Sequence, residues 1–360
     1  MSEFRCDPIT GRQVIIAPQR SRRPIAALSG SESKREPGPA YEAGCPFCAG
    51  NEAMTPPKLL ALGSGGVSAD ERGWQVRVVP NRYPAVERTQ ERPRANDSAS
   101  AGYGAHEVLV ESPLHNRQPG SFPPGQMELV IEALHRRGEA LAGDPKLHYL
   151  QFFRNYRSGA GASLEHPHSQ IIALPFVPPL LRRELEQTRK LYLAGGGCPF
   201  CRLLEEECVL MERIIALNES FSAFIPYAAR SPFESWILPR RHGASFLETG
   251  AEERAALAAI LERVLRALAQ ALDDPPYNYY LHAAPLRSPP MPYYHWHIEI
   301  HPRVGINAGF EMGSGVYINE IVPEEAARFI REKGRDEDGR ERQKDLLHPC
   351  AAQSPAGGES

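Results

Sequence analysis

Residues 166–172 read HPHSQII, and residues 295–300 read HWHIEI. In both stretches a pair of histidines two residues apart leads into an alternating run, which is typical of a strand with one polar face. Residues two apart in a strand point to the same side. His166, His168 and Gln170 are therefore predicted to share one face, and the second stretch repeats the pattern.

The sequence around each histidine pair is also repeated. Each half of the chain contains the tetrapeptide CPFC, then a strand ending near a single histidine, a long helix, an aromatic-rich strand and the histidine pair. His115 precedes His166 by 51 residues, and His242 precedes His295 by 53. Agreement in both order and spacing indicates a duplication, which has to be recognised before any fold is assigned.

Length and pattern agree with two domains. The chain has 360 residues, which at roughly 150 residues per domain suggests about two. Several strand candidates follow one another directly, which favours an α+β fold of two similar domains with mainly antiparallel sheets flanked by helices. We predict domains at 1–178 and 179–335, and a disordered tail at 336–360, where charged and then small polar residues dominate. The strand candidates are 13–18, 75–80, 106–111, 149–156, 169–174, 213–217, 222–226, 235–239, 277–282 and 295–302, and the helix candidates are 125–142, 179–193, 251–272 and 323–333.

Charge and hydropathy exclude several classes of protein. Lys and Arg number 41 against 44 Asp and Glu, a formal net charge of −3, whereas a dedicated DNA-binding protein normally carries a large basic excess. No apolar run reaches the roughly 18 residues of a membrane span, and the first residues lack the apolar core of a signal peptide. We therefore expect a cytoplasmic protein that binds neither nucleic acid nor a membrane.

The seven cysteines favour metal binding over disulfides, because their number is odd and four of them form the two CPFC tetrapeptides. A Cys-x-x-Cys knuckle presents two thiolates, and tetrahedral zinc then needs two more ligands, commonly histidines. The alternative is that each CPFC forms only a tight turn with free thiols. We predict two structural zinc ions, the first held by Cys45, Cys48, His115 and His166 and the second by Cys198, Cys201, His242 and His295.

The glycine-rich stretch before His166, RNYRSGAGASLE, suits a phosphorylated ligand. An imidazole can attack phosphorus and form a covalent intermediate, while Gln170 and the backbone N–H groups of 159–163 can stabilise charge on the phosphoryl oxygens. From spacing alone, the alternative is that both histidines are metal ligands or ordinary strand residues. The second copy has Trp296 and no glycine-rich approach, so we expect only the first copy to be reactive.

The run from Asn155 through Gly161-x-Ser163 to His-Pro-His-Ser-Gln at 166–170 resembles the active-site signature of the galactose-1-phosphate uridylyltransferases, a branch of the histidine-triad superfamily. The likeness extends over the duplicated halves and the cysteine knuckles, and it implies that the two halves are duplicated histidine-triad-like domains. It implies a ping-pong transfer in which His168 attacks the α-phosphorus of UDP-glucose, releases the sugar 1-phosphate and carries the nucleotide to a hexose 1-phosphate. It also implies that His166 binds zinc and so places its neighbour, and that Gln170 holds a phosphoryl oxygen.

The resemblance implies further substrate-binding roles. Taken alone, Arg20 and Arg23 look like an ordinary basic loop and Asn81 like a turn residue. By resemblance, the two arginines contact phosphate and Asn81 lies in the nucleotide pocket. Family members often pair two subunits, so a homodimer is expected. The residues assigned in this way are Arg20, Arg23 and Asn81, then Asn155, Gly161 and Ser163 around the α-phosphate, and Phe310 and Glu311 at the hexose hydroxyls.

Departures from the family pattern leave the substrate open. Gly305 and Tyr317 stand where better-known members have a Lys and a Gln. The two CPFC knuckles and the ending GFEMGSGVYIN look more like the branch that transfers AMP from ADP-glucose to inorganic phosphate. The uridylyltransferase is the commoner activity and comes first. The alternatives are the ADP-glucose phosphorylase and a histidine-triad hydrolase in which water resolves the intermediate.

The second metal site also has a competing interpretation. By resemblance, His282, His295 and His297 match a second metal site of the better-known branch. That set shares His295 with the predicted cysteine site. We favour the cysteine site, because the second CPFC would otherwise have no partners.

Overall fold

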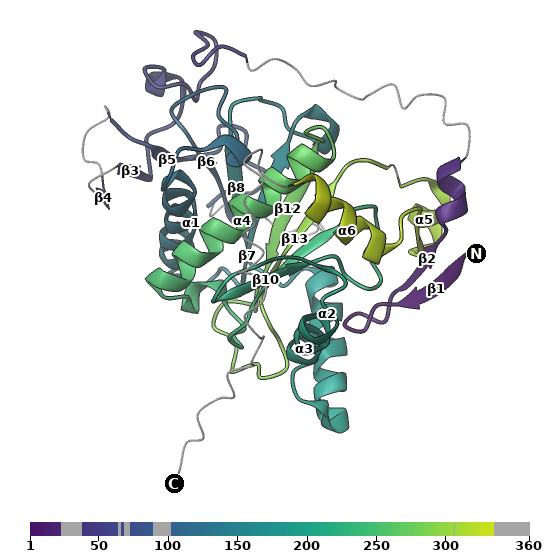
Figure 1. Cartoon of the computed structure of the whole chain (residues 1–360). Coiled ribbons are helices and arrows are strands. Elements are labelled where there is room, and N and C mark those ends of the chain that lie inside the picture. Colours follow the sequence, from purple (N-terminus) through teal and green to yellow (C-terminus); the bar gives the residue numbers. More distant parts are fainter. Residues whose placement is uncertain (23–37, 64–65, 68–72, 89–101, 306, 335–360) are drawn as a thin grey trace.

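The computed structural model describes residues 1–22, 38–63, 66–67, 73–88, 102–305 and 307–334. Arg23 and the predicted tail lie outside the described residues. One large sheet occupies the centre of the molecule, and helices pack against it (Figure 1). The fold is therefore α+β, as the sequence predicted.

The central sheet has 11 strands, in the order β4-β3-β5-β6-β8-β7-β12-β13-β11-β10-β9. Every neighbouring pair is antiparallel. The prediction of mainly antiparallel pairing is confirmed. The strands are β3 (Leu60–Gly63), β4 (Gly66–Val67), β5 (Val76–Pro80), β6 (Ala105–Val110), β7 (Tyr149–Tyr156), β8 (His168–Leu174), β9 (Ile214–Leu217), β10 (Phe221–Phe224), β11 (Ser235–Pro239), β12 (Tyr277–His282) and β13 (His297–Pro302).

The strand order is symmetric about the pair β7–β12. Outward from this pair, one side runs β7-β8-β6-β5 and the other runs β12-β13-β11-β10. Each of these four strands on one side has a counterpart in the other half of the chain. Tyr277 pairs with Tyr156 and Leu281 with Phe152 across the centre. The two copies thus share one continuous sheet, and the boundary between residues 178 and 179 stays a prediction.

Two long helices cover one face of the sheet. α1 (Gln126–Ala142) and α4 (Ala251–Ala271) lie side by side (Figure 1). Their apolar residues recur every three or four positions, which gives each helix one buried stripe. α6 (Pro323–Lys333) packs beside α4. None of the helices in the described ranges is long and apolar enough to cross a bilayer. The buried stripes consist of Val130, Ile131 and Leu134 in α1, and Leu257, Leu261, Val264, Leu265 and Leu268 in α4.

Two further helices, α2 (Pro179–Leu191) and α3 (Pro199–Leu210), cover part of the opposite face. Their buried side chains pack with Trp236 and Leu238 of β11. Ile237, between these two residues, belongs instead to the core under α1 and α4. Because neighbouring residues of a strand point to opposite faces, the sheet separates two hydrophobic cores.

A small sheet lies at the edge of the molecule. It contains β1 (Glu3–Cys6), β2 (Gln13–Ile16) and β14 (Tyr317–Asn319), with β14 parallel to β2. The short helix α5 (Gly309–Ser314) precedes β14, and the 3₁₀ helix η1 (Pro18–Arg22) follows β2. Figure 1 places this small sheet and α5 on the side opposite β3–β6.

All ten predicted strands and all four predicted long helices are present, most with ends shifted by one or two residues. The sequence analysis missed α3, α5 and the short strands β1, β3, β4 and β14. The remaining short helical segments are η2 (Glu52–Met54), η3 (Pro119–Ser121), η4 (Ser158–Ala160), η5 (Tyr192–Gly196) and η6 (Phe246–Glu248).

A buried ion pair supports the end of the sheet next to the histidine strand. Arg154 of β7 is only 1% exposed, and its Nε lies 3.0 Å from a carboxylate oxygen of Glu111. Its other nitrogens donate to Tyr277 of β12 at 3.0 Å and to Gln118 at 2.7 Å. Gln118 in turn donates to the carbonyl of Glu165, directly before His166. The Arg154 guanidinium thus connects β7, β12 and, through Gln118, the segment that leads into β8.

Replacing this arginine is expected to destabilise the whole fold. Arg154→Met leaves the fully buried Glu111 carboxylate without its charge partner, which costs about 3 kcal/mol or more. Arg136→Met, which removes a half-exposed arginine paired with Glu132 four residues earlier, is the matched control and should cost less than about 1 kcal/mol. Urea unfolding measures both. Equal losses in the two variants would contradict the role assigned to Arg154.

Candidate active site and metal clusters

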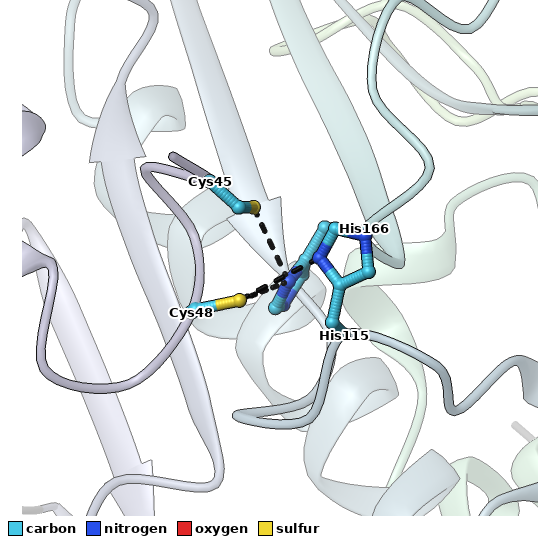
Figure 2. Close-up of side chains that lie close together, drawn as sticks. All are labelled: Cys45, Cys48, His115 and His166. Carbon is cyan, nitrogen blue, oxygen red and sulfur yellow. Dashed lines mark hydrogen bonds between the residues drawn. The ribbon is translucent and has the colours of Figure 1, made fainter. Parts of the chain in front are cut away.

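Two cysteines and two histidines of the first half converge on one point, as Figure 2 shows. The Sγ of Cys48 lies 3.5 Å from Nδ1 of His115 and 3.6 Å from Nδ1 of His166, and Cys45 lies 3.6 Å from the same nitrogen of His166. All four residues are buried. The structure therefore brings together the predicted first ligand set.

The separations between these atoms fit a shared tetrahedral ion. Zinc–sulfur bonds of roughly 2.3 Å and zinc–nitrogen bonds of roughly 2.0 Å at tetrahedral angles separate sulfur from nitrogen by about 3.5 Å. Burial also lowers the pKa of His166 to about 4, so the neutral imidazole that binds metals dominates at neutral pH. Both the geometry and the protonation state suit a metal ion.

Outer contacts orient the two histidines. Nε2 of His166 donates to the carbonyl of Ser112 at 2.8 Å, and Nε2 of His115 donates to Glu42 at 3.1 Å. Each ring thereby keeps the lone pair of Nδ1 directed at the cysteines. The backbone N–H of Glu42 also donates to Sγ of Cys48 at 3.3 Å. Such contacts commonly fix the tautomer and direction of metal ligands.

The second half forms a matching cluster. Sγ of Cys201 lies 3.4 Å from Nδ1 of His242 and 3.6 Å from Nδ1 of His295, and the ligand atoms of these three residues and Cys198 lie within 4.8 Å of one another. This cluster is more open than the first, because His242 is exposed and Cys201 is half-buried.

The competing histidines belong to a separate group. His282 and His297 lie beside Glu184, with Nδ1 of His282 at 3.1 Å from its carboxylate. His295 points to the cysteines and is not part of this group. The geometry therefore favours the cysteine set over the set that combines His282, His295 and His297.

His168 has the arrangement of a nucleophile. Its Nδ1 lies 2.8 Å from the carbonyl oxygen of His166, which can only accept, so Nδ1 carries the hydrogen and Nε2 keeps a lone pair. The side chain is 7% exposed, and burial lowers the pKa of His168, which favours the neutral ring. The ring of Phe47, from the first CPFC, lies 5.5 Å away. The backbone of His166, a member of the first Cys/His cluster, thus sets the tautomer of His168.

Gln170 is oriented by a histidine that the sequence analysis missed. The backbone N–H of Ala85 donates to Nδ1 of His106 at 3.1 Å, so Nε2 of His106 carries the hydrogen and donates to Oε1 of Gln170 at 2.8 Å. The amide nitrogen of Gln170 is then left to donate elsewhere. Nδ2 of Asn81 also lies 3.1 Å from Nε2 of His106, but in this tautomer both nitrogens carry hydrogen and the contact is not a hydrogen bond. Val108 pairs with Gln170, which puts His106 at the next position of the same face.

The glycine-rich turn between β7 and β8 has an unusual backbone. Arg157 has a φ of 63° and Gly161 a φ of 87°, and the 3₁₀ helix η4 lies between them. Glycine suits the second position because it adopts left-handed φ values without steric cost. Asn155 enters the turn from β7, while Gly161 and Ser163 are exposed. The predicted phosphate-loop residues therefore lie on one turn beside β8.

The other predicted substrate-binding residues lie elsewhere in the chain. Arg20 forms an ion pair with Glu320 at 3.7 Å, and Glu311 caps α5 by accepting from the backbone N–H of Ala308 at 2.9 Å. Phe310 on the same helix is half exposed. Figure 1 shows α5 and η1 at the edge opposite β6. Within one chain, these residues are not part of the site around His168.

The second histidine strand repeats the geometry but is inaccessible. Nδ1 of His297 lies 3.1 Å from the carbonyl of His295, as in the first copy. However, Trp236 stacks on the His297 ring at 5.2 Å and Phe200 lies at 4.9 Å. His297 has no exposed surface, so a substrate has no access to it.

Comparisons with known proteins agree with this architecture. Residues 1–178 match the model of the galactose-1-phosphate uridyl transferase N-terminal domain, and residues 149–337 match that of the C-terminal domain. An ADP-glucose phosphorylase from Arabidopsis thaliana is 35% identical, with 92% of each chain covered. A galactose-1-phosphate uridylyltransferase from Thermotoga maritima is 30% identical, covering 92% of this chain and 98% of that one. The crystal structure of the Arabidopsis thaliana enzyme with bound ADP-glucose superposes with a TM-score of 0.80 at 33% identity, over 92% of this chain and 98% of that one.

The two Cys/His clusters predict a metal content of two ions per chain. Cys45→Ser and Cys198→Ser should each remove one equivalent, because each leaves a site with only three strong ligands. Cys6→Ser, at an exposed cysteine outside both clusters, is the control and should retain both ions. Elemental analysis of the purified protein measures the content. An unchanged metal content in Cys45→Ser would refute the first site.

Proposed function

The chain belongs to the galactose-1-phosphate uridylyltransferase family, and we propose that it is a nucleotidyltransferase that moves UMP from UDP-glucose to a hexose 1-phosphate. The observation that carries the proposal is the geometry of His168. Its Nδ1–H is held by a backbone carbonyl, so Nε2 is a neutral, directed nucleophile. The adjacent glycine-rich turn offers backbone N–H groups to a phosphoryl group.

The reaction proceeds in two displacements. Nε2 of His168 attacks the α-phosphorus, the bond from phosphorus to the sugar phosphate oxygen breaks, and glucose 1-phosphate leaves. An oxygen of the acceptor phosphate then attacks the same phosphorus, and the phosphorus–nitrogen bond breaks to restore the neutral ring. The hydrogen bond from Nδ1 to the His166 carbonyl stabilises the positive charge that the ring carries between the steps. Gln170, oriented by His106, and Ser163 donate to phosphoryl oxygens.

We assign zinc to both Cys/His clusters. Two thiolates and two imidazoles form a ligand set typical of structural zinc, and four protein ligands leave no open position. Bound zinc would cross-link the CPFC loop to His166. The strand backbone then places His168 two residues beyond the ligand His166.

The substrate residues distant from His168 fit a homodimer. Arg20 belongs to η1, and Phe310 and Glu311 belong to α5, which lies on the side of the molecule opposite β3–β6 (Figure 1); Phe310 is half exposed. A second copy of the chain could bring this side to the site of the first. Arg23 would follow Arg20 in the same segment. The two halves, 1–178 and 179–335, would then act as a catalytic domain and a supporting domain.

An ADP-glucose phosphorylase activity is the second candidate. It is favoured by the similarity to the Arabidopsis thaliana enzyme, whose structure contains ADP-glucose. Gly305 and Tyr317 also replace the Lys and Gln of better-known uridylyltransferases. In this case the covalent nucleotide would be AMP and the acceptor inorganic phosphate, with the same role for His168.

Product analysis separates the candidates. Purified protein is incubated with UDP-glucose or ADP-glucose labelled at the α-phosphorus, together with galactose 1-phosphate, phosphate or no acceptor. The uridylyltransferase predicts UDP-galactose from the first donor and acceptor, whereas the phosphorylase predicts ADP from ADP-glucose and phosphate. Rapid turnover without any acceptor would instead identify a histidine-triad hydrolase.

His168→Ala is expected to lower transfer by about 10⁵-fold and to abolish covalent labelling, because it removes the nucleophile. His168→Gly should regain activity when free imidazole is supplied. His148→Ala changes an exposed histidine and serves as the control with unchanged rates. Undiminished transfer by His168→Ala would overturn the mechanism.

A further inference from the structure

The nucleotide turn of the first half is built on residues of the second half. Asp274 accepts hydrogen bonds from Tyr156 at 2.8 Å and from Arg157 at 2.5 Å. A Cβ on Gly159 would lie only 2.9 Å from Cγ of Pro276, so the turn packs directly against the segment that enters β12. These contacts place the second half immediately beneath the turn.

One side chain of the second half contacts both Asn155 and the turn. Nδ2 of Asn278 donates to Oδ1 of Asn155 at 2.7 Å and to the carbonyl of Ala160 at 2.8 Å. Oδ1 of Asn278 accepts from Nε of Arg303 at 2.6 Å. Asn278 is nearly buried, with 9% exposure, whereas Arg303 is exposed.

The direction of this chain of hydrogen bonds is fixed by its two ends. The guanidinium of Arg303 can only donate and the carbonyl of Ala160 can only accept, so the Asn278 amide has one orientation. Because Nδ2 of Asn278 faces Asn155, the Asn155 oxygen must face Asn278. The nitrogen of Asn155 then points to the other side, where it lies 4.0 Å from the place of a Cβ on Gly161.

This orientation matters because Asn155 lies beside the nucleophile. Phe153 and Gln170 are the last paired residues of β7 and β8 on this side, and Asn155 and His168 each stand two residues further on, at the same end and on the same face of the sheet. An asparagine amide turned the other way would present an oxygen, not an N–H, to a bound phosphoryl group. A fixed donor needs no reorganisation as charge develops on phosphorus.

We propose that Asn278 and Arg303 are positioning residues that hold the Asn155 amide with its nitrogen towards a phosphoryl oxygen of the bound nucleotide. The proposal rests on the proposed function, since it assumes a nucleotide at the turn. Neither residue touches the substrate in this account. Their effect passes through Asn155 and the carbonyl of Ala160.

Asn278→Asp tests the proposal at constant side-chain shape. The carboxylate still accepts from Arg303 but has no hydrogen to donate, so Asn155 must rotate its nitrogen towards position 278 and its oxygen towards the phosphate. We expect formation of the covalent nucleotidyl enzyme at saturating nucleotide sugar to slow by about tenfold or more. Binding of UDP or ADP, measured by calorimetry, should weaken as well, and the unfolding midpoint reports any damage to the fold.

Arg303→Met provides a second test at an exposed position, where folding is not at stake. Without the donor, only the carbonyl of Ala160 still orients the Asn278 amide, so the amide is held less firmly and the same rate should fall. Arg303→Lys restores a donor and should recover most of the rate, which a purely structural role of the side chain does not predict. Arg328→Met changes an exposed arginine of α6 and is the matched control with wild-type behaviour. The double variant Asn278→Asp/Arg303→Met should be no slower than Asn278→Asp alone, because both act along one path.

The outcomes distinguish this proposal from the function it rests on. Wild-type protein that forms no covalent nucleotide contradicts the proposed function, and binding of UDP and ADP to the same variants then decides the role of Asn278 and Arg303. If the wild-type protein forms the covalent nucleotide, and Asn278→Asp or Arg303→Met forms it at the wild-type rate, the positioning role alone is overturned. Slower formation of the covalent nucleotide in both variants, with recovery of the rate in Arg303→Lys, supports the positioning role.

Discussion

The antiparallel pairing of β7 with β12 is the interaction on which the rest of the molecule depends. Without it, each half would expose a long edge strand rich in aromatic residues, which readily pairs with other chains. Pairing Tyr156 with Tyr277 and Phe152 with Leu281 satisfies both edges and makes one sheet of the two copies. The same pairing brings Asn278 against Asn155 and Tyr277 against the Arg154 side chain. The site therefore belongs to neither half alone.

The strand period of two connects the first Cys/His cluster to His168, the proposed nucleophile. The His166 ring faces the cysteines while its carbonyl holds Nδ1 of His168. Restricting the first ring with a metal also restricts the backbone that orients the second. A metal ion held by His166 would therefore affect the position and tautomer of the His168 ring without taking part in the chemistry.

The sequence allowed prediction of features that depend on local periodicity or on repetition. The strands and long helices followed from their apolar patterns, and the four members of each Cys/His cluster from matched spacing. By contrast, β14 has only three residues, and α3 begins within the second CPFC, where no helix was predicted. The sequence could not predict the contacts of His106, Asn278 and Arg303, because these contacts depend on the register between strands and on how the two halves meet. Spacing also could not separate His295 from His297, since both belong to one alternating run.

The second copy encloses its own histidine and contacts the glycine-rich turn of the first. Trp236 and Phe200 enclose His297, the counterpart of His168, and remove it from solvent. Meanwhile Asp274, Pro276 and Asn278 hold the turn of the first copy. A duplicated half that only completed the sheet could vary freely at these positions. Because the Asn155 amide is oriented by Asn278 of β12 and by Arg303, which directly follows β13, the turn of the first half depends on the second half even though His297 is enclosed there.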